Sequence, residues 1–83
     1  MVRVVGVEAL ANYRIGVRFE DGVEGIVGLS DFVCKGVFAP LRDPQEFGRV
    51  FVDQVTRTVA WPGGIDLCPD ALYADIKAQQ EAA

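Results

Sequence analysis

Residues 61–73 constrain the fold more than any other stretch of this 83-residue chain. Pro62 cannot donate a hydrogen bond to a strand ladder, and Gly63-Gly64 permits positive φ, so we expect a strand to end at Trp61 and the chain to turn there. Pro69 then suits the first position of a helix, where its missing N–H has no intrahelical partner. The stretch therefore predicts β-sheet before it and helix after it.

Three segments before residue 30 have the composition of strands. Residues 2–10 are β-branched and apolar at their centre, which is typical of a central strand. Along residues 13–19 apolar side chains alternate with polar ones or glycine, so one face of that strand should lie on the core. Gly22 permits a tight turn before a third strand over residues 23–29. These segments predict a three-stranded antiparallel meander.

The middle of the chain predicts short helices. Ser30 or Asp31 is a candidate cap for a helix through residues 32–34. Asp43 is expected to be the N-cap of a second short helix that has Pro44 at its first position.

Strand patterns then return. Residues 49–53 and 58–61 should form a hairpin, and the last helix should run from about residue 69 to about residue 80. The sequence as a whole predicts a single α+β domain over residues 1–83. It should have a roughly five-stranded antiparallel sheet, made of the meander plus the hairpin, with short connecting helices and one C-terminal helix.

The charge of the chain argues against nucleic-acid binding. Eight basic and twelve acidic residues give a net charge of −4 at pH 7. Nonspecific affinity for DNA comes mainly from Lys and Arg side chains that neutralise phosphates. The basic residues here are scattered, although a sheet is able to bring Arg14 and Arg18 onto one face. We expect no direct nucleic-acid binding.

The sequence has no histidine and two cysteines, Cys34 and Cys68. This excludes Ser-His-Asp and Cys-His catalysis and the usual zinc ligand sets. Cys68 lies at the expected helix start, which favours a thiolate, but Asp66 and Asp70 beside it disfavour that charge. Two carboxylates are also too few to hold a hard cation. We expect no enzyme activity, no catalytic residue, no metal site and no cofactor.

No membrane association is expected either. The sequence lacks the run of about 20 apolar residues that spans a bilayer. Arg3 and Glu8 interrupt the N-terminal apolar stretch, which argues against a secretory signal. With 51% hydrophobic and 24% charged residues, the composition is that of a folded soluble domain. We expect the protein to be cytoplasmic.

Trp61, Asp66 and Tyr73 are the candidate binding or structural residues. A single tryptophan in a small domain is usually a core residue whose N–H is hydrogen-bonded, although tryptophan also occurs at binding surfaces. Asp66 is expected to accept hydrogen bonds that order the Gly63-Gly64 turn against the helix start.

Several motifs together resemble one protein family. They are Phe19-Glu20-Asp21-Gly22, then Phe38-Ala39-Pro40-Leu41-Arg42-Asp43 ahead of Phe47, and residues 61–73, which read Trp-Pro-Gly-Gly-Ile-Asp-Leu-Cys-Pro-Asp-Ala-Leu-Tyr. Nearly the whole chain resembles the bacterial family known as domain of unknown function 2442. The resemblance implies a small α+β fold with a closing helix, and no catalytic residue.

The same resemblance suggests two contexts for the domain. In some relatives it stands ahead of a helix-turn-helix domain. Stand-alone relatives are often found in pairs with another small protein, like toxin–antitoxin systems. The 83 residues leave no room for a helix-turn-helix, so the DNA contact of such relatives is not carried over to this chain.

Two functional hypotheses follow. The first is a small cytoplasmic protein-interaction module, an antitoxin-like partner of another small protein, because the chain is small, acidic and without catalytic groups. The alternative is a ligand-sensing or regulatory domain with a pocket between the sheet and the C-terminal helix, near Trp61 and Tyr73. An enzyme that uses Cys68, or Asp66 with Asp70, ranks last.

We also expect an assembly, either a dimer with itself or a complex with another small protein. Four valines, Val2, Val4, Val5 and Val7, place apolar groups on both faces of the first strand, and small domains often need a partner to bury enough surface. The competing expectation is a monomeric core completed by four residues from the middle of the chain, Phe32, Phe38, Leu41 and Phe47.

Overall fold

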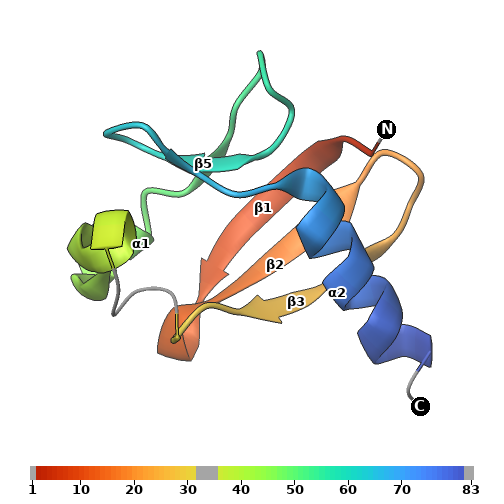
Figure 1. Cartoon of the computed structure of the whole chain (residues 1–83), viewed down its shortest axis with the longest axis horizontal. Coiled ribbons are helices and arrows are strands. Elements are labelled where there is room, and N and C mark those ends of the chain that lie inside the picture. Colours follow the sequence, from red (N-terminus) through yellow and green to blue (C-terminus); the bar gives the residue numbers. More distant parts are fainter. Residues whose placement is uncertain (1, 32–35, 82–83) are drawn as a thin grey trace.

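The computed structural model describes residues 2–31 and 36–81. Within these ranges the chain forms two three-stranded antiparallel sheets, one within residues 4–28 and one within residues 51–66. The long helix α2 (Pro69–Glu81) lies across one face of the first sheet, and the second sheet lies beside the first strand, β1 (Val4–Leu10) (Figure 1). The α+β class is confirmed, whereas the prediction of one five-stranded sheet is wrong.

The first sheet is the predicted meander. Its strands are β1 (Val4–Leu10), β2 (Arg14–Phe19) and β3 (Glu24–Gly28), paired antiparallel in sequence order. The turn before β3 has Gly22 at φ 93°, as expected. Asp21 stabilises that turn, because its Oδ1 accepts a hydrogen bond from the N–H of Val23 at 3.0 Å.

The second sheet contains a strand that we did not predict. Its strands are β4 (Phe51–Val52), β5 (Val59–Trp61) and β6 (Ile65–Asp66). Gly63 and Gly64 both have positive φ, at 98° and 87°. Such a turn reverses the direction of the chain, as hairpin turns do, and so β6 returns to pair with β5. The glycines therefore extend the sheet by one strand before the helix begins.

The described ranges contain four helical segments: 3-10 helices at Ala11–Tyr13 and Gly36–Arg42, α1 at Pro44–Phe47 and α2 at Pro69–Glu81. The two 3-10 helices were not predicted, whereas α1 and α2 lie where helices were expected. Asp43 is the N-cap of α1, as predicted, and its Oδ1 accepts a hydrogen bond from the N–H of Gln45 at 2.9 Å. The bounds predicted for α2 are confirmed to within a residue. The helix predicted over residues 32–34 lies outside the described residues.

The core lies between the first sheet, α2 and the second sheet. Its buried hydrophobic members are Val4, Ile15, Val17, Phe19, Val27, Leu29, Leu41, Phe47, Val59, Trp61, Leu72 and Ile76. Leu41 and Phe47 therefore enter the core, and Phe38 is half-buried against it, as the expectation of a core completed from the middle of the chain required. Phe32 lies outside the described residues.

Hydrogen bonds join the first sheet to the second and the second sheet to α1. The N–H of Val4 in β1 donates to the carbonyl of Arg57, next to the second sheet, at 2.9 Å. Trp61 has 1% of its surface exposed, and its indole N–H donates to the carbonyl of Phe47 at 2.9 Å. The prediction that Trp61 is a core residue with a satisfied N–H is confirmed.

Candidate functional site

The face of the first sheet that points away from α2 is the candidate functional surface, and we call it the outer face. The strand register places nine residues on it in three rows: Gly6, Arg18 and Glu24; Glu8, Gly16 and Ile26; Leu10, Arg14 and Gly28. Each row has one glycine, on a different strand each time. The glycines therefore form a diagonal line across the sheet, with charged and aliphatic side chains on both sides of it.

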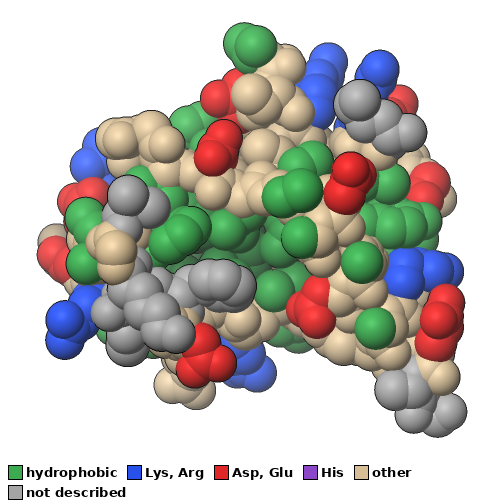
Figure 2. Space-filling view, viewed as in Figure 1, with side chains coloured by type: hydrophobic (Ala, Val, Ile, Leu, Met, Phe, Trp, Pro, Cys, Tyr) green, Lys and Arg blue, Asp and Glu red, His purple; other side chains and the backbone are tan. Residues whose placement is uncertain are grey.

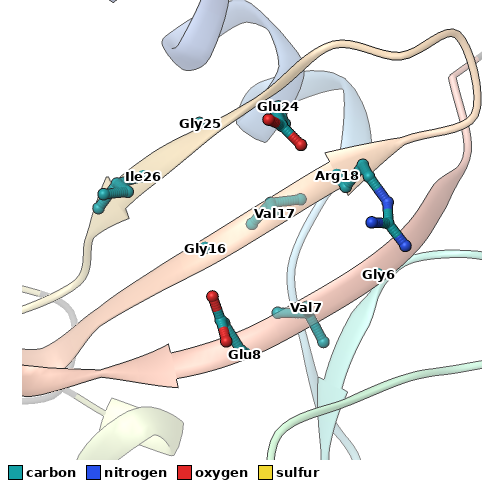
Figure 3. Close-up of a pocket in the computed structure, with 9 residues that line it drawn as sticks. All are labelled: Gly6, Val7, Glu8, Gly16, Val17, Arg18, Glu24, Gly25 and Ile26. Atoms are coloured by element: carbon teal, nitrogen blue, oxygen red, sulfur yellow. The ribbon is translucent and has the colours of Figure 1, made fainter.

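The missing side chains at Gly6 and Gly16 leave a hollow of about 610 Å³ on this face. Neighbouring charged side chains lie over the glycines (Figure 3). A Cβ atom placed on Gly6 would lie 3.2 Å from Nη2 of Arg18, and one placed on Gly16 would lie 3.4 Å from Cγ of Glu8. Glycine at these two positions thus lets Arg18 and Glu8 lie flat across the sheet.

The charged groups around the hollow are open to an outside partner. Arg18 and Glu24 stand opposite each other on β2 and β3, and Glu8 approaches from β1 (Figure 3). None of the three makes an ion pair within 4.0 Å among the residues that the structure describes. The carboxylates and the guanidinium are exposed, so they are available to pair with groups of opposite charge on another molecule.

The apolar sheet face that motivated the expected assembly is not what the structure shows. Val4 is buried, and Val7 is half-buried against the core. Val5 is 44% exposed, next to an irregularity in the pairing of β1 with β2. The outer face itself mixes charges and glycines, with Ile26, at 47% exposure, as its most exposed aliphatic residue. A reason for assembly must therefore come from this mixed chemistry.

The strand β3 forms an edge of the first sheet. The N–H of Phe19 donates to the carbonyl of Val23, and the N–H of Leu29 donates to the carbonyl of Tyr13, each at 2.8 Å. In an antiparallel pair alternate residues face the neighbouring strand. The odd-numbered residues from 23 to 29 therefore bond to β2, and the even-numbered ones direct their N–H and C=O groups away from it.

The outward side of β3 is only partly occupied. Nε2 of Gln80, in α2, donates to the carbonyl of Glu24 at 3.0 Å, which confirms that this carbonyl faces outward. The outward N–H and carbonyl groups of Ile26 and Gly28 have no hydrogen-bond partner among the described residues. This leaves a short edge where another strand is able to add.

On the opposite side of the molecule, hydrophobic side chains gather between α2 and the second sheet, with charged side chains around them (Figure 2). Tyr73 lies on this helix. Its ring meets that of Phe19 edge-on, with 5.0 Å between the centroids, and its hydroxyl donates to Oδ2 of Asp21 at 2.7 Å. The 610 Å³ hollow lies on the outer face, so the pocket expected between sheet and helix, near Trp61 and Tyr73, is not confirmed.

Asp66 does not order the turn as expected. It is exposed in β6, where it is opposite Ala60, and its carboxylate accepts no hydrogen bond from any described residue. The segment is instead held by Thr58, whose buried hydroxyl donates to the carbonyl of Leu67 at 2.6 Å. Trp61, Asp66 and Tyr73 therefore belong to different surroundings: the core, an exposed strand and the contact of α2 with the first sheet.

The Tyr73–Asp21 hydrogen bond changes the ionisation of both groups. It is the main cause that lowers the pKa of Asp21 below its ordinary value, and the bond from the N–H of Val23 adds to this effect. The same hydrogen bond raises the pKa of Tyr73 above its ordinary value. Both shifts favour the state in which a neutral hydroxyl donates to a carboxylate, so the contact holds across the neutral pH range.

Other candidate chemistry has little support. Cys68 is a free, exposed thiol, and Cys34 lies outside the described residues. Among residues 2–31 and 36–81 no three Asp, Glu or Cys side chains gather into a group that would hold a metal ion. Helices in the described ranges are all too short or too polar to cross a membrane.

The diagonal of glycines was missed at the sequence level. We considered glycines only where they permit turns, at Gly22 and Gly63-Gly64, rather than glycines on different strands. The signal was present in the two turns of the meander, because turn positions fix strand register. Applied to Gly6 and Gly16, that register would have shown the two glycines on adjacent strands, one row apart on the same face.

Comparisons with known proteins agree with this fold. The chain resembles the crystal structure of "Putative DNA Binding Protein NE0471" from Nitrosomonas europaea ATCC 19718, with a TM-score of 0.80 and 30% sequence identity. The match covers 98% of this chain and 52% of that chain, so this chain spans about half the length of the neighbour. The comparison with curated proteins found no match. The family described as "Protein of unknown function (DUF2442)" matches over residues 4–78, nearly the full length, and this chain belongs to that family.

Proposed function

We propose that this chain is a protein-interaction module that binds through the outer face of its first sheet. The observation that carries the proposal is that Glu8, Arg18 and Glu24, around the hollow, make no ion pair with any described residue and lie next to the partly open edge of β3. Three charges with no partner in the described chain do little for folding, because exposed charges contribute little to stability. They are well suited to set the specificity of a contact with another protein.

The neighbour from Nitrosomonas europaea supports a modular role. This chain corresponds to 52% of that protein, so the same fold is used there as one part of a longer chain. That protein carries the name of a DNA-binding protein. For this chain we propose that the module itself makes no DNA contact, because its net charge is −4 and Arg14 and Arg18 share the outer face with Glu8 and Glu24.

In its finer form, the proposal is that the partner is a second copy or another small protein, and that this acidic chain acts like an antitoxin in the cytoplasm. A basic partner would complement its charge. We propose a non-enzymatic role, which agrees with the lack of the histidine that Ser-His-Asp and Cys-His catalysis require. A direct test is co-expression with the product of the adjacent gene: rescue from growth arrest supports the antitoxin-like role, and unchanged growth arrest contradicts it.

Site-specific photo-crosslinking in the native cells tests the interaction surface. A photoreactive residue at position 8 or 18 reports on the outer face, and the same residue at position 54, in the exposed loop between β4 and β5, is the matched control. We expect covalent adducts to a discrete protein from positions 8 and 18 only. Equal adducts from all three positions, or none, contradict the proposal.

The second candidate function is ligand sensing. The hydrophobic side chains gathered between α2 and the second sheet favour it, because small-molecule sites are mostly apolar (Figure 2). A thermal-shift screen with metabolites separates the two functions. A saturable rise in melting temperature that is lost in a Tyr73→Ala variant and kept in a Glu8→Ala variant supports the ligand site. No shift across the screen supports the interaction module.

A further inference from the structure

We infer that the β3 edges of two copies of this chain pair with each other, antiparallel and centred on Ile26, to form one continuous six-stranded sheet. This inference rests on the proposed function, because it names the surface and the partner for one of the contacts proposed above. It goes further because it specifies which residues of the two β3 strands pair. The outward-facing backbone groups of β3 and the side chains on the outer face together determine this pairing.

The backbone of β3 provides the hydrogen bonds. Ile26 and Gly28 direct N–H and carbonyl groups outward, and no described residue occupies them. The strand Glu24–Gly28 contains no proline and no lysine, which are the residues that commonly protect edge strands from pairing. At Glu24 the side chain of Gln80 already bonds the carbonyl, but a carbonyl oxygen accepts two hydrogen bonds.

The side chains select the register. Pairing centred on Ile26 places this residue against Ile26 of the second copy, so that two half-exposed aliphatic side chains cover each other. The same register places each Glu24 opposite a Gly28. Pairing centred on Glu24 instead would place two carboxylates directly opposite each other, which is unfavourable in a sheet. Among the antiparallel registers, the one centred on Ile26 thus joins apolar to apolar and keeps the carboxylates apart.

Charge complementarity supports the same register. Arg14 on β2 is paired with Gly28 on β3, and in the proposed register this Gly28 lies opposite Glu24 of the other copy. The backbones of Arg14 and that Glu24 are thus separated by two strand spacings, about 10 Å. Gly28 has no side chain, and nothing lies within 4 Å of the position where its Cβ would be. Nε of Arg14 donates to the carbonyl of Ala11 at 3.1 Å, which leaves its two terminal nitrogens to meet Glu24 over the glycine, once on each side of the twofold axis.

This register can be tested by substitution, because residue 26 of one copy would lie opposite residue 26 of the other. Mass is measured by light scattering across a dilution series from about 1 mM to about 10 µM, since an edge contact is smaller than the roughly 800 Å² per partner of a standard interface. We expect the wild-type mass to rise from 9.0 kDa toward twice that value, about 18 kDa. Ile26→Lys and Ile26→Glu should each weaken self-association by about tenfold or more, through like charges at the centre.

Mixing the two variants should restore the dimer, because the ammonium introduced on one copy would then face the carboxylate introduced on the other. Val5→Lys is the matched control: Val5 is exposed to a similar extent on β1, at 44% against 47% for Ile26, and this variant should dimerise like the wild type. Hydrogen exchange of the wild-type protein provides a readout without any substitution. The amide of Ile26 should exchange more slowly as concentration rises, and that of Gly25, already within the sheet, should change little.

Four outcomes overturn the inference. A mass that stays near 9.0 kDa up to about 1 mM excludes the dimer. A dimer that survives Ile26→Lys, or a mixture of the two variants that stays monomeric, excludes this register. An extended segment of a different protein bound at β3, seen as protection of the Ile26 amide only when that protein is added, excludes the second copy as the occupant. None of these results touches the crosslinking experiment, so the proposed function stands or fails separately.

Discussion

The two faces of the first sheet differ in chemistry although they alternate residue by residue along the same three strands. The inner face has Ile15, Val17 and Val27, all buried against α2 and the second sheet. The outer face has a line of glycines between charged side chains, of which Glu8, Arg18 and Glu24 make no ion pair among the described residues. The side chains of the inner face are closely packed, whereas the glycines of the outer face leave a hollow on the surface. One face of the sheet therefore stabilises the fold, and the other is the proposed recognition surface.

The largest expected difference compares two isoleucines. Ile15→Ala on the inner face should cost about 2–5 kcal/mol of unfolding free energy, because its side chain is fully buried and a cavity would remain. Ile26→Ala on the outer face should change that free energy by about 0.5 kcal/mol or less. Chemical denaturation of both variants, at a concentration low enough to keep the chain monomeric, measures the difference. Similar costs for the two variants would show that the outer face also stabilises the monomer.

Two glycines on β3 give the next comparison. A Cβ on Gly25 would lie 2.7 Å from Cγ2 of Ile76, so Gly25→Ala should push α2 away and cost about 1–3 kcal/mol. Nothing lies within 4 Å of a Cβ on Gly28, so Gly28→Ala should be close to neutral. The melting temperatures of the two variants measure this difference. If Gly25→Ala has the melting temperature of the wild type, Ile76 of α2 does not pack directly on Gly25.

A smaller effect compares a buried with an exposed polar residue in the second sheet. Thr58→Val should cost about 1 kcal/mol, because it removes the hydrogen bond to Leu67 and leaves that carbonyl without its partner. Asp66→Ala should stay within about 0.5 kcal/mol of the wild type. Urea titration of each variant gives both values. The reverse order would restore Asp66 as the residue that orders this turn.

The smallest effect concerns the contact between Tyr73 and Asp21, at the rim of the inner face. Because the folded pKa of Asp21 lies below its ordinary value, its contribution to stability is present above about pH 4 and is lost as pH falls further. The raised pKa of Tyr73 gives the opposite window, in which stability is lost as pH rises above about 10. Tyr73→Phe should lower the melting temperature slightly at pH 7. The melting temperature of this variant should also change less with pH, both below about pH 4 and above about pH 10. Parallel pH profiles for the variant and the wild type would contradict this account.

Local features of the fold were predictable from the sequence, and non-local ones were only partly so. The alternation in residues 13–19, the Asp43 cap and the proline at residue 69 each act within a few residues, and the structure confirms all three. The strand β6 was missed because Gly63-Gly64 permits both a sheet end and a hairpin, and only pairing with β5 decides between them. The separation into two sheets depends on the contact between β1 and the second sheet, which no short stretch encodes.

The candidate surface was harder to predict than the fold. Charges on the outer face were recognised only as the neighbouring Arg14 and Arg18, because both lie on one strand. Its hollow comes from glycines ten residues apart along the chain, Gly6 and Gly16, brought together by the meander. Tyr73 and Asp21 were both noticed as parts of motifs, but their hydrogen bond spans 52 positions and depends on where α2 packs.

The position of Trp61 also gives this protein an internal spectroscopic probe. It is the only tryptophan in the chain, it is buried in the core, and its ring centroid lies 5.8 Å from that of Phe47. Its fluorescence therefore reports the joining of α1 to β5. In a Tyr13→Phe variant Tyr73 is the one remaining tyrosine, so tyrosine emission then reports the docking of α2 on the meander. Recorded together during unfolding, the two signals would distinguish a domain that melts as one unit from one whose second sheet opens first.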